Sequence, residues 1–284
     1  MYKNVKIGLA LGGGAAKGSS HIGVLKVLEK NGIFPDYICG TSMGSIVGGL
    51  YASGMTTEQM EKELSTLKKS DLMDFSLLKI RRGGLLLGKK MQDTIEKYSK
   101  GAKIEDCKIP FSCVAVNLKD GTEQIFTSGI LSEAITASCC VPVVFHPIKK
   151  DDMILVDGGL LNNVPCDVVK KQDVDFVIAV NCVGEREFTD EQLNSTLKIL
   201  MAALDILLSK QARQKAEQYA DYYISFHTNI GSTAYNSKDT QKAVLMGEME
   251  AEEHMVELKK MLNKVNNKIK RKAKYAKLKE LNKK

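Results

Sequence analysis

The sequence predicts an α/β layered domain. Short apolar runs of strand length alternate along the chain with segments that repeat apolar residues at helical spacing. Two of the apolar runs lead through glycine-containing turns into helices, which gives two consecutive strand-turn-helix units. A chain of 284 residues with 44% hydrophobic residues can bury one sizeable core, so we expect one such domain followed by a tail.

The predicted strands are apolar or alternate between apolar and polar residues. In chain order they are Val5 to Leu11, Tyr37 to Cys39, Phe111 to Asn117, Glu123 to Phe126, Met153 to Val156, Phe176 to Asn181 and Tyr222 to Phe226. The third and fourth are joined across Asp120-Gly121, a dipeptide that favours a tight hairpin turn. The fifth delivers Asp157 at a strand end.

The predicted helices carry apolar residues on one face. In chain order they are His21 to Glu29, Ser45 to Tyr51, Thr57 to Leu67, Lys89 to Tyr98, Glu191 to Tyr219 and a helix from Gln241 onward. Gly48 and Gly49 indicate tight packing of the second helix. The stretch from Thr57 to Tyr98 is broken at Gly83-Gly84 and at Gly88, and it resembles an insertion over one end of a sheet.

The positive charge of the chain is concentrated at its C-terminal end. The formal net charge is +7, but residues 259–284 hold twelve Lys or Arg and one Glu, which gives this segment +11. By difference, residues 1–258 carry about −4. We therefore predict a main domain over 1–258 and a basic amphipathic helical tail over 259–284. Its apolar positions recur at helical spacing: Leu258, Leu262, Val265, Ile269, Ala273 and Ala276.

The basic tail fits more than one partner. An anionic membrane surface would attract its lysines, at about 1 kcal/mol for each nearby charge. A solvated or frayed helix end without a partner fits the pattern equally well. A nucleic-acid partner is disfavoured, because Tyr275 is the only aromatic residue of the segment and no binding motif accompanies it.

Cysteine usage and hydropathy indicate a cytoplasmic protein. The seven cysteines include no CxxC pair, which fits a reducing compartment better than a disulfide framework or a metal site. No signal-peptide pattern is evident. The longest helical apolar stretch, Ile199 to Leu208, is interrupted by Asp205 and is shorter than the ~20 residues of a spanning helix. We expect any membrane contact to be peripheral, on the inner face.

Gly40-Thr41-Ser42-Met43-Gly44 places a serine between a strand and a helix. Hydrolases present a nucleophile on such a sharp strand-to-helix turn. Gly40 and Gly44 remove side chains where the turn would clash, and the start of the following helix contributes positive potential near Ser42. The motif by itself is weak, so its interpretation depends on the glycine loop upstream and on Asp157 downstream.

The glycine loop from Gly12 to Gly18 can direct backbone N–H groups at the same point. We predict an oxyanion hole from Gly12, Gly13, Gly14 and Met43, with Gly13 and Gly14 as the best donors. One such donor is worth roughly 3 to 4 kcal/mol in well-studied enzymes.

Lys17, within this loop, either anchors it by bonding to backbone carbonyls or meets an anionic head group. The same residue argues against a dinucleotide fingerprint, which needs a third glycine at position 17. The residues around Gly18 do not complete a nucleotide-phosphate loop either. We therefore expect no nucleotide cofactor.

The three motifs in this order resemble the pattern of patatin-like phospholipases of the bacterial, soluble kind. They are the loop Gly12 to Gly18, the elbow Gly40 to Gly44, and Asp157-Gly158-Gly159. The segments Ala137 to Phe145 and Leu160 to Pro165 add to the resemblance, which covers roughly residues 5–185. His146 stands where the family often has proline.

The resemblance implies a three-layer fold with a central, mostly parallel sheet flanked by helices. It also implies a catalytic dyad in which Asp157 orients Ser42 and takes its proton, without a histidine, a cofactor or a metal. The motif residues that support this dyad are Lys17, Gly18, Gly40, Gly44, Gly158 and Gly159. The implied function is that of a serine lipid acyl hydrolase, which cleaves phospholipid, lysophospholipid or another fatty-acyl ester through an acyl-enzyme.

Two alternatives stay open at this point. A Ser-His-Asp esterase for small soluble esters would need His227 or His254, whereas His21 and His146 are expected to be structural. A non-catalytic protein could instead use the basic tail to dock on a membrane or nucleic acid. By analogy and position, we expect the segment Thr57 to Tyr98 and the helix from Glu191 to shape an acyl channel. The oligomeric state is left open.

Overall fold

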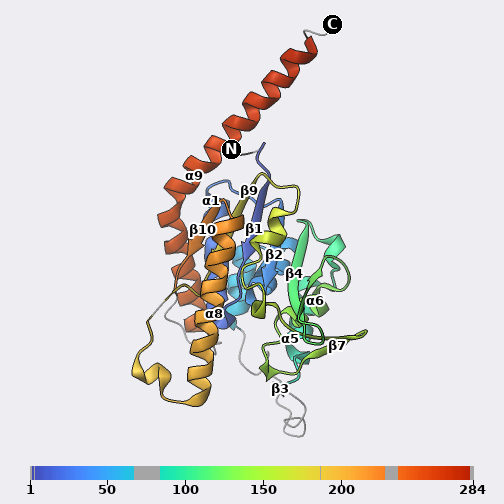
Figure 1. The fold of residues 1–284 in the computed structure, drawn as a ribbon, viewed down its shortest axis with the longest axis vertical. Coiled ribbons are helices and arrows are strands. Elements are labelled where there is room, and N and C mark those ends of the chain that lie inside the picture. The colour runs from blue at the N-terminus through green and yellow to red at the C-terminus, as the bar shows by residue number, and fades with distance from the viewer. Residues whose placement is uncertain (1, 3, 67–83, 186, 228–235, 282–284) are drawn as a thin grey trace.

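The computed structural model describes residues 2, 4–66, 84–185, 187–227 and 236–281, in which an eight-stranded sheet lies between helices (Figure 1). Its strand order is β10-β9-β1-β2-β4-β8-β7, with β5 paired to β4. The parallel strands are β1 (Ile7–Leu11), β2 (Tyr37–Thr41), β4 (Phe111–Asn117), β9 (Phe176–Asn181) and β10 (Tyr222–Ser225). The antiparallel strands are β5 (Thr122–Phe126), β7 (Ile148–Lys150) and β8 (Met153–Asp157).

Two separate hydrophobic clusters lie on the two faces of the sheet, and helices cover each of them. The domain therefore has three layers, with the sheet in the middle. Successive strand residues point to opposite faces, so Leu9 and Leu11 belong to one cluster and Ala10 to the other. The first cluster is covered by α1 (Ser20–Lys30), α2 (Met43–Ser53) and α9 (Ser237–Leu281). The second is covered by α7 (Cys166–Lys170) and α8 (Thr196–Tyr219). The predicted three-layer α/β fold is confirmed.

Several elements differ from the prediction. The helix predicted from Glu191 is a 3-10 turn, Asp190–Leu193, followed by α8, whose start is capped by Ser195. α3 (Thr57–Thr66) packs on α1 and α9, and α5 (Lys89–Ser99) packs on α6. Leu67 and Gly83 lie outside the described residues. Elements that were not predicted are β3 (Gly84–Leu86), α6 (Leu131–Ser138), β6 (Val143–Phe145), β7, α7 and the short 3-10 helices Ala15–Ser19, Ile104–Asp106 and Gly158–Leu160.

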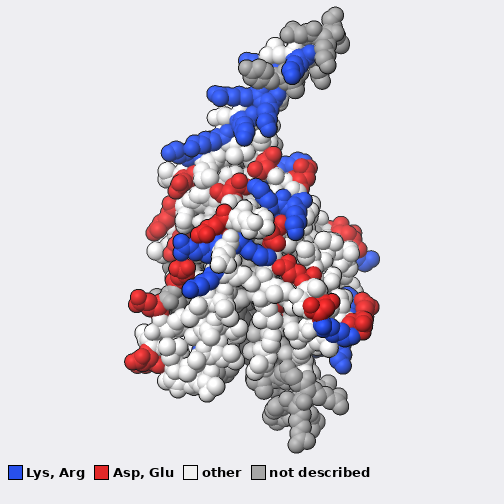
Figure 2. Space-filling view, in the orientation of Figure 1, with Lys and Arg blue, Asp and Glu red and all other residues white. Residues whose placement is uncertain are grey.

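Helix α9 continues without a break across the predicted boundary between residues 258 and 259. Leu258 and Leu262 are fully buried, and Val265 and Ile269 pack partly against the same core. Up to Ile269, the apolar stripe of the predicted tail therefore covers the domain instead of facing outward. Beyond this point the helix projects from the domain, and Lys and Arg side chains gather on the projecting part (Figures 1 and 2). No described helix is both long and apolar enough to cross a bilayer.

The sheet register brings the sequence motifs together. Thr41 at the end of β2 pairs with Val114 of β4, and the next residue of β4, Ala115, pairs with Asp157 at the end of β8. Ser42, which follows Thr41, is thereby placed beside Asp157, although 115 positions separate them in the sequence. Leu11, at the end of β1, pairs with Gly40 and brings the glycine loop to the same edge.

Candidate active site

Ser42 lies on a strained turn between β2 and α2. Its backbone φ of 53° and ψ of −126° fall in a region that residues other than glycine rarely adopt. The Ser42 N–H donates to Ser138 Oγ over 2.9 Å, and the Ser42 carbonyl accepts from the Ser45 hydroxyl over 2.6 Å. These bonds hold the turn in its unusual conformation. The Ser42 side chain is nearly buried, with 7% exposed.

The glycines on both sides of Ser42 are required by close backbone contacts. A Cβ atom at Gly44 would lie 2.2 Å from the carbonyl oxygen of Leu11. A Cβ atom at Gly40 would lie 2.4 Å from the carbonyl oxygen of Gly44. Backbone atoms cannot rotate away from such contacts, so only glycine lets α2 start directly against the end of β1.

Asp157 lies at the end of β8 with its carboxyl group turned toward Ser42. Asp157 Oδ1 accepts from the Gly159 N–H over 2.8 Å, and the Ser42 hydroxyl lies close enough to the carboxylate to affect its pKa. Burial raises the pKa of Asp157 to about 6, and the nearby Ser42 hydroxyl and Gly159 N–H oppose this rise. Gly158 lies close against the Val114 carbonyl, which fixes the turn after Asp157.

The glycine loop approaches Ser42 closely, but its N–H groups do not all face the same point. A Cβ atom at Gly13 would lie 3.0 Å from Ser42 Cβ. The Gly12 N–H donates to the Val180 carbonyl over 3.0 Å, and the Gly13 N–H donates to the Asn163 carbonyl over 3.2 Å. Sheet pairing with β9 thus uses the N–H of Gly12, which was predicted as an oxyanion donor. Gly13, predicted as one of the two best donors, also has an acceptor within the protein.

Lys17 lies in the 3-10 helix after the glycines and is buried, with 1% exposed. Its Nζ forms an ion pair with Asp205 Oδ2 of α8 over 2.8 Å. Lys17 thus anchors the loop as one interpretation expected, but through a carboxylate and not through backbone carbonyls. Gly18, next to it, packs against the side chain of Met43.

A cavity of about 240 Å³ opens beside Ser42 and Asp157. Apart from these two and the glycines of both loops, its walls are mainly aliphatic: Val141, Pro142, Val143, Val144, Leu160, Val183, Leu200, Leu204 and Leu208. The three leucines from α8 agree with the expectation that this helix shapes the channel. No described residue of the segment Thr57 to Tyr98 lines the cavity, because α3 and α5 pack on other helices. Residues 67–83 of that segment lie outside the described part.

The four histidines lie away from the described cavity lining. His21 is fully buried with Nε2 2.7 Å from the Gly12 carbonyl, and burial lowers its pKa to about 4, as a core role requires. His254 Nδ1 is 2.9 Å from the hydroxyl of Tyr222 at the edge of the sheet, and His227 pairs with Val183. His146 follows β6. None of these contacts links a histidine to Ser42.

A comparison with known protein families identifies the family of the chain. A family model described as patatin-like phospholipase matches residues 9–170, more than half of the chain. The chain belongs to the patatin-like phospholipase family. The crystal structure of VipD from Legionella pneumophila resembles this member of the family with a TM-score of 0.56 at 15% identity, over 92% of this chain and 67% of that chain. At this identity the likeness concerns the fold alone.

Other patatin-like relatives are closer in sequence. Uncharacterised NTE family proteins of Mycobacterium bovis and Mycobacterium tuberculosis are 34% identical over 212 residues, which cover 71% of this chain and 58% of theirs. Lysophospholipase NTE1 of Candida albicans is 34% identical over 200 residues, which cover 69% of this chain and 14% of that protein. The chain thus aligns with little more than half of the mycobacterial relatives and with a small part of the yeast one.

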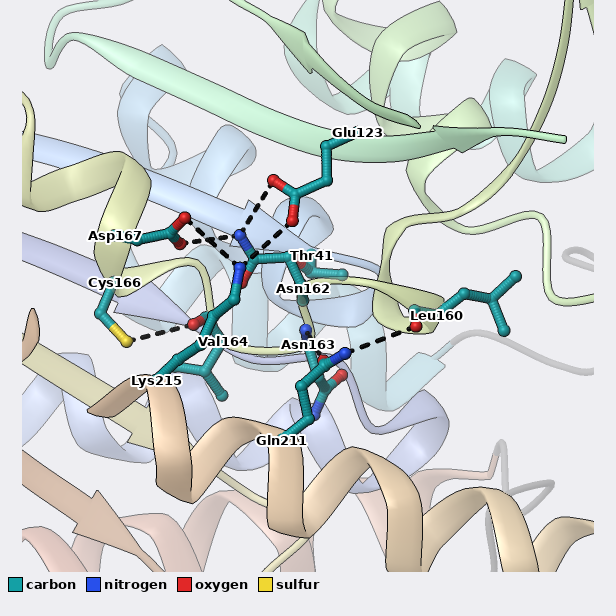
Figure 3. A network of polar contacts seen from close by, with 10 residues as sticks. All are labelled: Thr41, Glu123, Leu160, Asn162, Asn163, Val164, Cys166, Asp167, Gln211 and Lys215. Carbon is teal, nitrogen blue, oxygen red and sulfur yellow. Dashed lines mark hydrogen bonds and ion pairs between the residues drawn. The ribbon is translucent and has the colours of Figure 1, made fainter. Parts of the chain in front are cut away.

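A polar network supports the segment that follows Asp157 in this patatin-like fold (Figure 3). Lys215 Nζ of α8 lies 3.2 Å from Glu123 Oε1 and 3.3 Å from Asp167 Oδ2. Asn162 Nδ2 donates to the same two carboxylates, over 3.3 Å and 2.8 Å. The Asn162 carbonyl accepts from the Thr41 hydroxyl over 2.8 Å, next to Ser42. The network therefore ties the elbow, the Asp157 segment and α8 together.

Sequence reasoning missed several residues of the site. Asn163 is buried, lines the cavity, and has no hydrogen-bond partner at Nδ2 among the described residues. Gln211 Oε1 accepts from the Asn163 N–H over 2.9 Å, so α8 also positions this residue. Ser138, which accepts from the Ser42 N–H, falls inside the segment that resembles the family. Asp205 carried a visible signal, because it interrupts an otherwise apolar stretch.

Proposed function

We propose that this patatin-like protein hydrolyses fatty-acyl esters of lipids, of the phospholipid or lysophospholipid kind. The observation that carries the proposal is that Ser42 and Asp157, both buried, lie side by side in the lining of a largely aliphatic cavity. Serine needs a base in contact with its hydroxyl to become a nucleophile at neutral pH. An aliphatic wall suits the acyl chain of a lipid.

In the proposed first step, Ser42 Oγ attacks the acyl carbonyl carbon while Asp157 takes the hydroxyl proton. A pKa of about 6 leaves Asp157 mostly ionised at pH 7 and makes it a stronger base than an exposed aspartate. The carbonyl oxygen becomes negative in the tetrahedral intermediate. We assign the N–H groups of Gly14 and Met43 to this oxygen, since Gly12 and Gly13 donate elsewhere.

Collapse of the intermediate releases the alcohol part of the lipid, which takes the proton from Asp157. The acyl group is then bound to Ser42 as an ester. In the second step Asp157 takes a proton from water, the water oxygen attacks the acyl carbon, and the fatty acid leaves as Ser42 recovers its proton. The strained turn and its bond to Ser138 keep the nucleophile in place through both steps.

The described contacts give the alternatives less support. A Ser-His-Asp esterase would need a histidine beside the Ser42–Asp157 pair, and His227 and His254 have contacts elsewhere. A silent docking protein would not need a buried serine beside a buried carboxylate of raised pKa. That residues 259–284 bind an anionic membrane stays a prediction.

The test combines active-site labelling with a substrate panel. A fluorophosphonate probe should label the parent protein and not Ser42→Ala, and the parent should hydrolyse long-chain lysophospholipid or phospholipid. Asp157→Asn should reduce turnover at least a hundredfold while circular dichroism stays unchanged. Turnover retained in Ser42→Ala would overturn the proposal. Hydrolysis of short esters alone, abolished by His227→Ala or His254→Ala, would favour the alternative esterase.

A further inference from the structure

The N-terminal half of α8 exposes several large aliphatic side chains. Ile199, Ile206 and Leu207 are 52%, 46% and 65% exposed, and Ala203 between them is exposed as well. Because successive helix residues turn by about 100°, these four positions share one side of the helix. A contiguous exposed apolar surface marks an interaction site, whereas scattered single residues do not.

The same helix carries this apolar surface into the cavity beside Ser42. Leu200, Leu204 and Leu208 follow one another at intervals of one turn and line the cavity, and Leu200 is also 45% exposed. The exposed and cavity-lining positions together occupy roughly 200° of the helix circumference. The exposed aliphatic side of α8 therefore continues into the aliphatic part of the cavity wall, which also contains Asn163 and Asp205.

Two exposed aliphatic residues outside α8 also line the cavity. Val143 at the start of β6 and Leu160 at the end of the 3-10 helix after Asp157 both line the cavity. They are 56% and 37% exposed. An acyl chain that enters the cavity from outside would thus meet exposed aliphatic side chains from β6 and from the segment after Asp157 as well as from α8. We call the surface formed by residues 143, 160, 199, 200, 203, 206 and 207 the mouth face.

Charged groups are sparse over this part of α8 in the view of Figure 2. Lys198 lies in the first turns of α8, but its Nζ donates to the Glu191 carbonyl and to Asn194 Oδ1 over 3.0 Å and 2.9 Å. The basic end of α9 projects from the opposite end of the molecule (Figure 1). With 45 residues α9 is about 67 Å long, many times the screening length of about 8 Å in physiological salt. Attraction of that end to anionic lipid would therefore not by itself place the mouth face on a membrane.

We propose that the mouth face docks on the hydrocarbon region of a neutral lipid bilayer, so that the cavity receives its substrate directly from the membrane. This inference rests on the proposed function, because a lipid ester is the substrate that such an opening would serve. Burial of exposed aliphatic area in lipid supplies the binding free energy. Docking needs no charge pairing, so it takes place on zwitterionic lipid and changes little with salt.

The test measures co-sedimentation of the full chain with phosphatidylcholine vesicles. The double variant Ile199→Asp/Leu207→Asp changes exposed positions outside the cavity lining, and it should weaken vesicle binding at least tenfold. Val256→Asp, at an 82% exposed aliphatic position on α9, is the matched control and should bind like the parent. For a water-soluble short-chain ester, kcat/KM should stay within twofold in both variants, while hydrolysis of vesicle lipid falls only in the double variant.

Three results would overturn the docking proposal. The double variant could bind phosphatidylcholine vesicles as tightly as the parent. The parent could bind only vesicles that contain phosphatidylglycerol, with binding lost in Lys264→Glu/Lys268→Glu/Lys272→Glu. Light scattering could show a parent dimer that the double variant dissociates, which would assign the mouth face to a second copy of the chain.

Different results would refute the proposed function and the docking proposal. Ser42→Ala should bind vesicles like the parent, because binding requires no hydrolysis. Vesicle binding that depends on Ile199 and Leu207, in a parent that cleaves neither soluble nor vesicle esters, would support docking and refute the hydrolase.

Discussion

Lys17 of the glycine loop and Asp205 of α8 form a buried ion pair, with Nζ and Oδ2 2.8 Å apart. The pair joins the loop beside Ser42 to the helix whose leucines line the cavity. An ammonium group that is 1% exposed needs a nearby carboxylate to offset its loss of hydration. The position of α8 over the site is therefore coupled to the position of the glycine loop.

Removing one partner of this pair should be costly. Asp205→Ala would leave the Lys17 ammonium buried without its carboxylate, and we expect a loss of about 3 to 5 kcal/mol in the free energy of unfolding. The double variant Lys17→Met/Asp205→Leu removes both charges and should recover most of that loss. Urea unfolding of the parent, Asp205→Ala, Lys17→Met, Asp205→Leu and the double variant measures the loss and the coupling. A loss below about 1 kcal/mol in Asp205→Ala would contradict a buried, coupled pair.

The raised pKa of Asp157 should make its contribution to stability depend on pH. An aspartate in an unfolded chain titrates near 4, whereas burial raises the pKa of Asp157 to about 6 in the folded protein. Between these values the folded state holds a proton that the unfolded state has lost. Stability therefore falls as the pH rises from about 4 to about 6, and the full cost of the buried charge is present above that range.

Asp157→Asn keeps the shape of the side chain and removes this charge. Its gain in the free energy of unfolding over the parent should be near zero at pH 4 and on the order of 3 kcal/mol above pH 7. Urea unfolding at several pH values measures the difference. Asp152→Asn, which changes a fully exposed carboxylate in the same way, is the control. A gain for Asp157→Asn that does not vary with pH would contradict the raised pKa.

The same titration should appear in catalysis. If Asp157 is the base, kcat/KM for a soluble ester rises with pH through a midpoint of about 6, because only the ionised carboxylate can take the Ser42 proton. A pH series with one short-chain ester measures this midpoint. A profile that stays flat from pH 4.5 to pH 8 would show that another group acts as the base.

Gly44 should tolerate no side chain. Gly44→Ala would place a Cβ atom 2.2 Å from the Leu11 carbonyl oxygen and 2.6 Å from the Gly12 carbonyl oxygen, so β1 and α2 would have to separate. We expect a loss of more than about 3 kcal/mol in the free energy of unfolding. Gly121→Ala is the control, since Gly121 has a φ of 70° and open space around it. It should cost only about 1 to 2 kcal/mol. Equal losses in thermal or urea unfolding would contradict the role of the contact.

The longer strands, the elbow and the glycine loop could be predicted because runs of consecutive residues determine them. Other features depend on distant partners. The direction of the Gly12 N–H is set by Val180 of β9, and no local pattern around Gly12 reports it. Asp205 was visible as a charge within an apolar helix, but its partner Lys17 lies 188 positions away. Strand β6 has only three residues, too few for an alternation signal, so Val143 was not predicted at the cavity.

Lys215 offers a test of how the segment after Asp157 is held. Lys215 lies between Glu123 and Asp167, and all three side chains are at least three-quarters buried. Lys215→Met would leave two carboxylates close together with only the Asn162 amide between them, so we expect a loss of about 1 to 3 kcal/mol in the free energy of unfolding. Because Asn162 also binds the Thr41 hydroxyl beside Ser42, kcat should fall too.

The matched control for Lys215→Met is Lys170→Met. Lys170 forms an ion pair with Asp221 at the surface, where both side chains are about a third or more exposed. Surface pairs contribute about 0 to 1 kcal/mol, so this variant should lose little stability and no activity. Urea unfolding together with kcat on a soluble ester measures both effects. If the two lysine variants lose equal stability and keep equal kcat, the network does not position the site, and the segment after Asp157 is held by its backbone contacts alone.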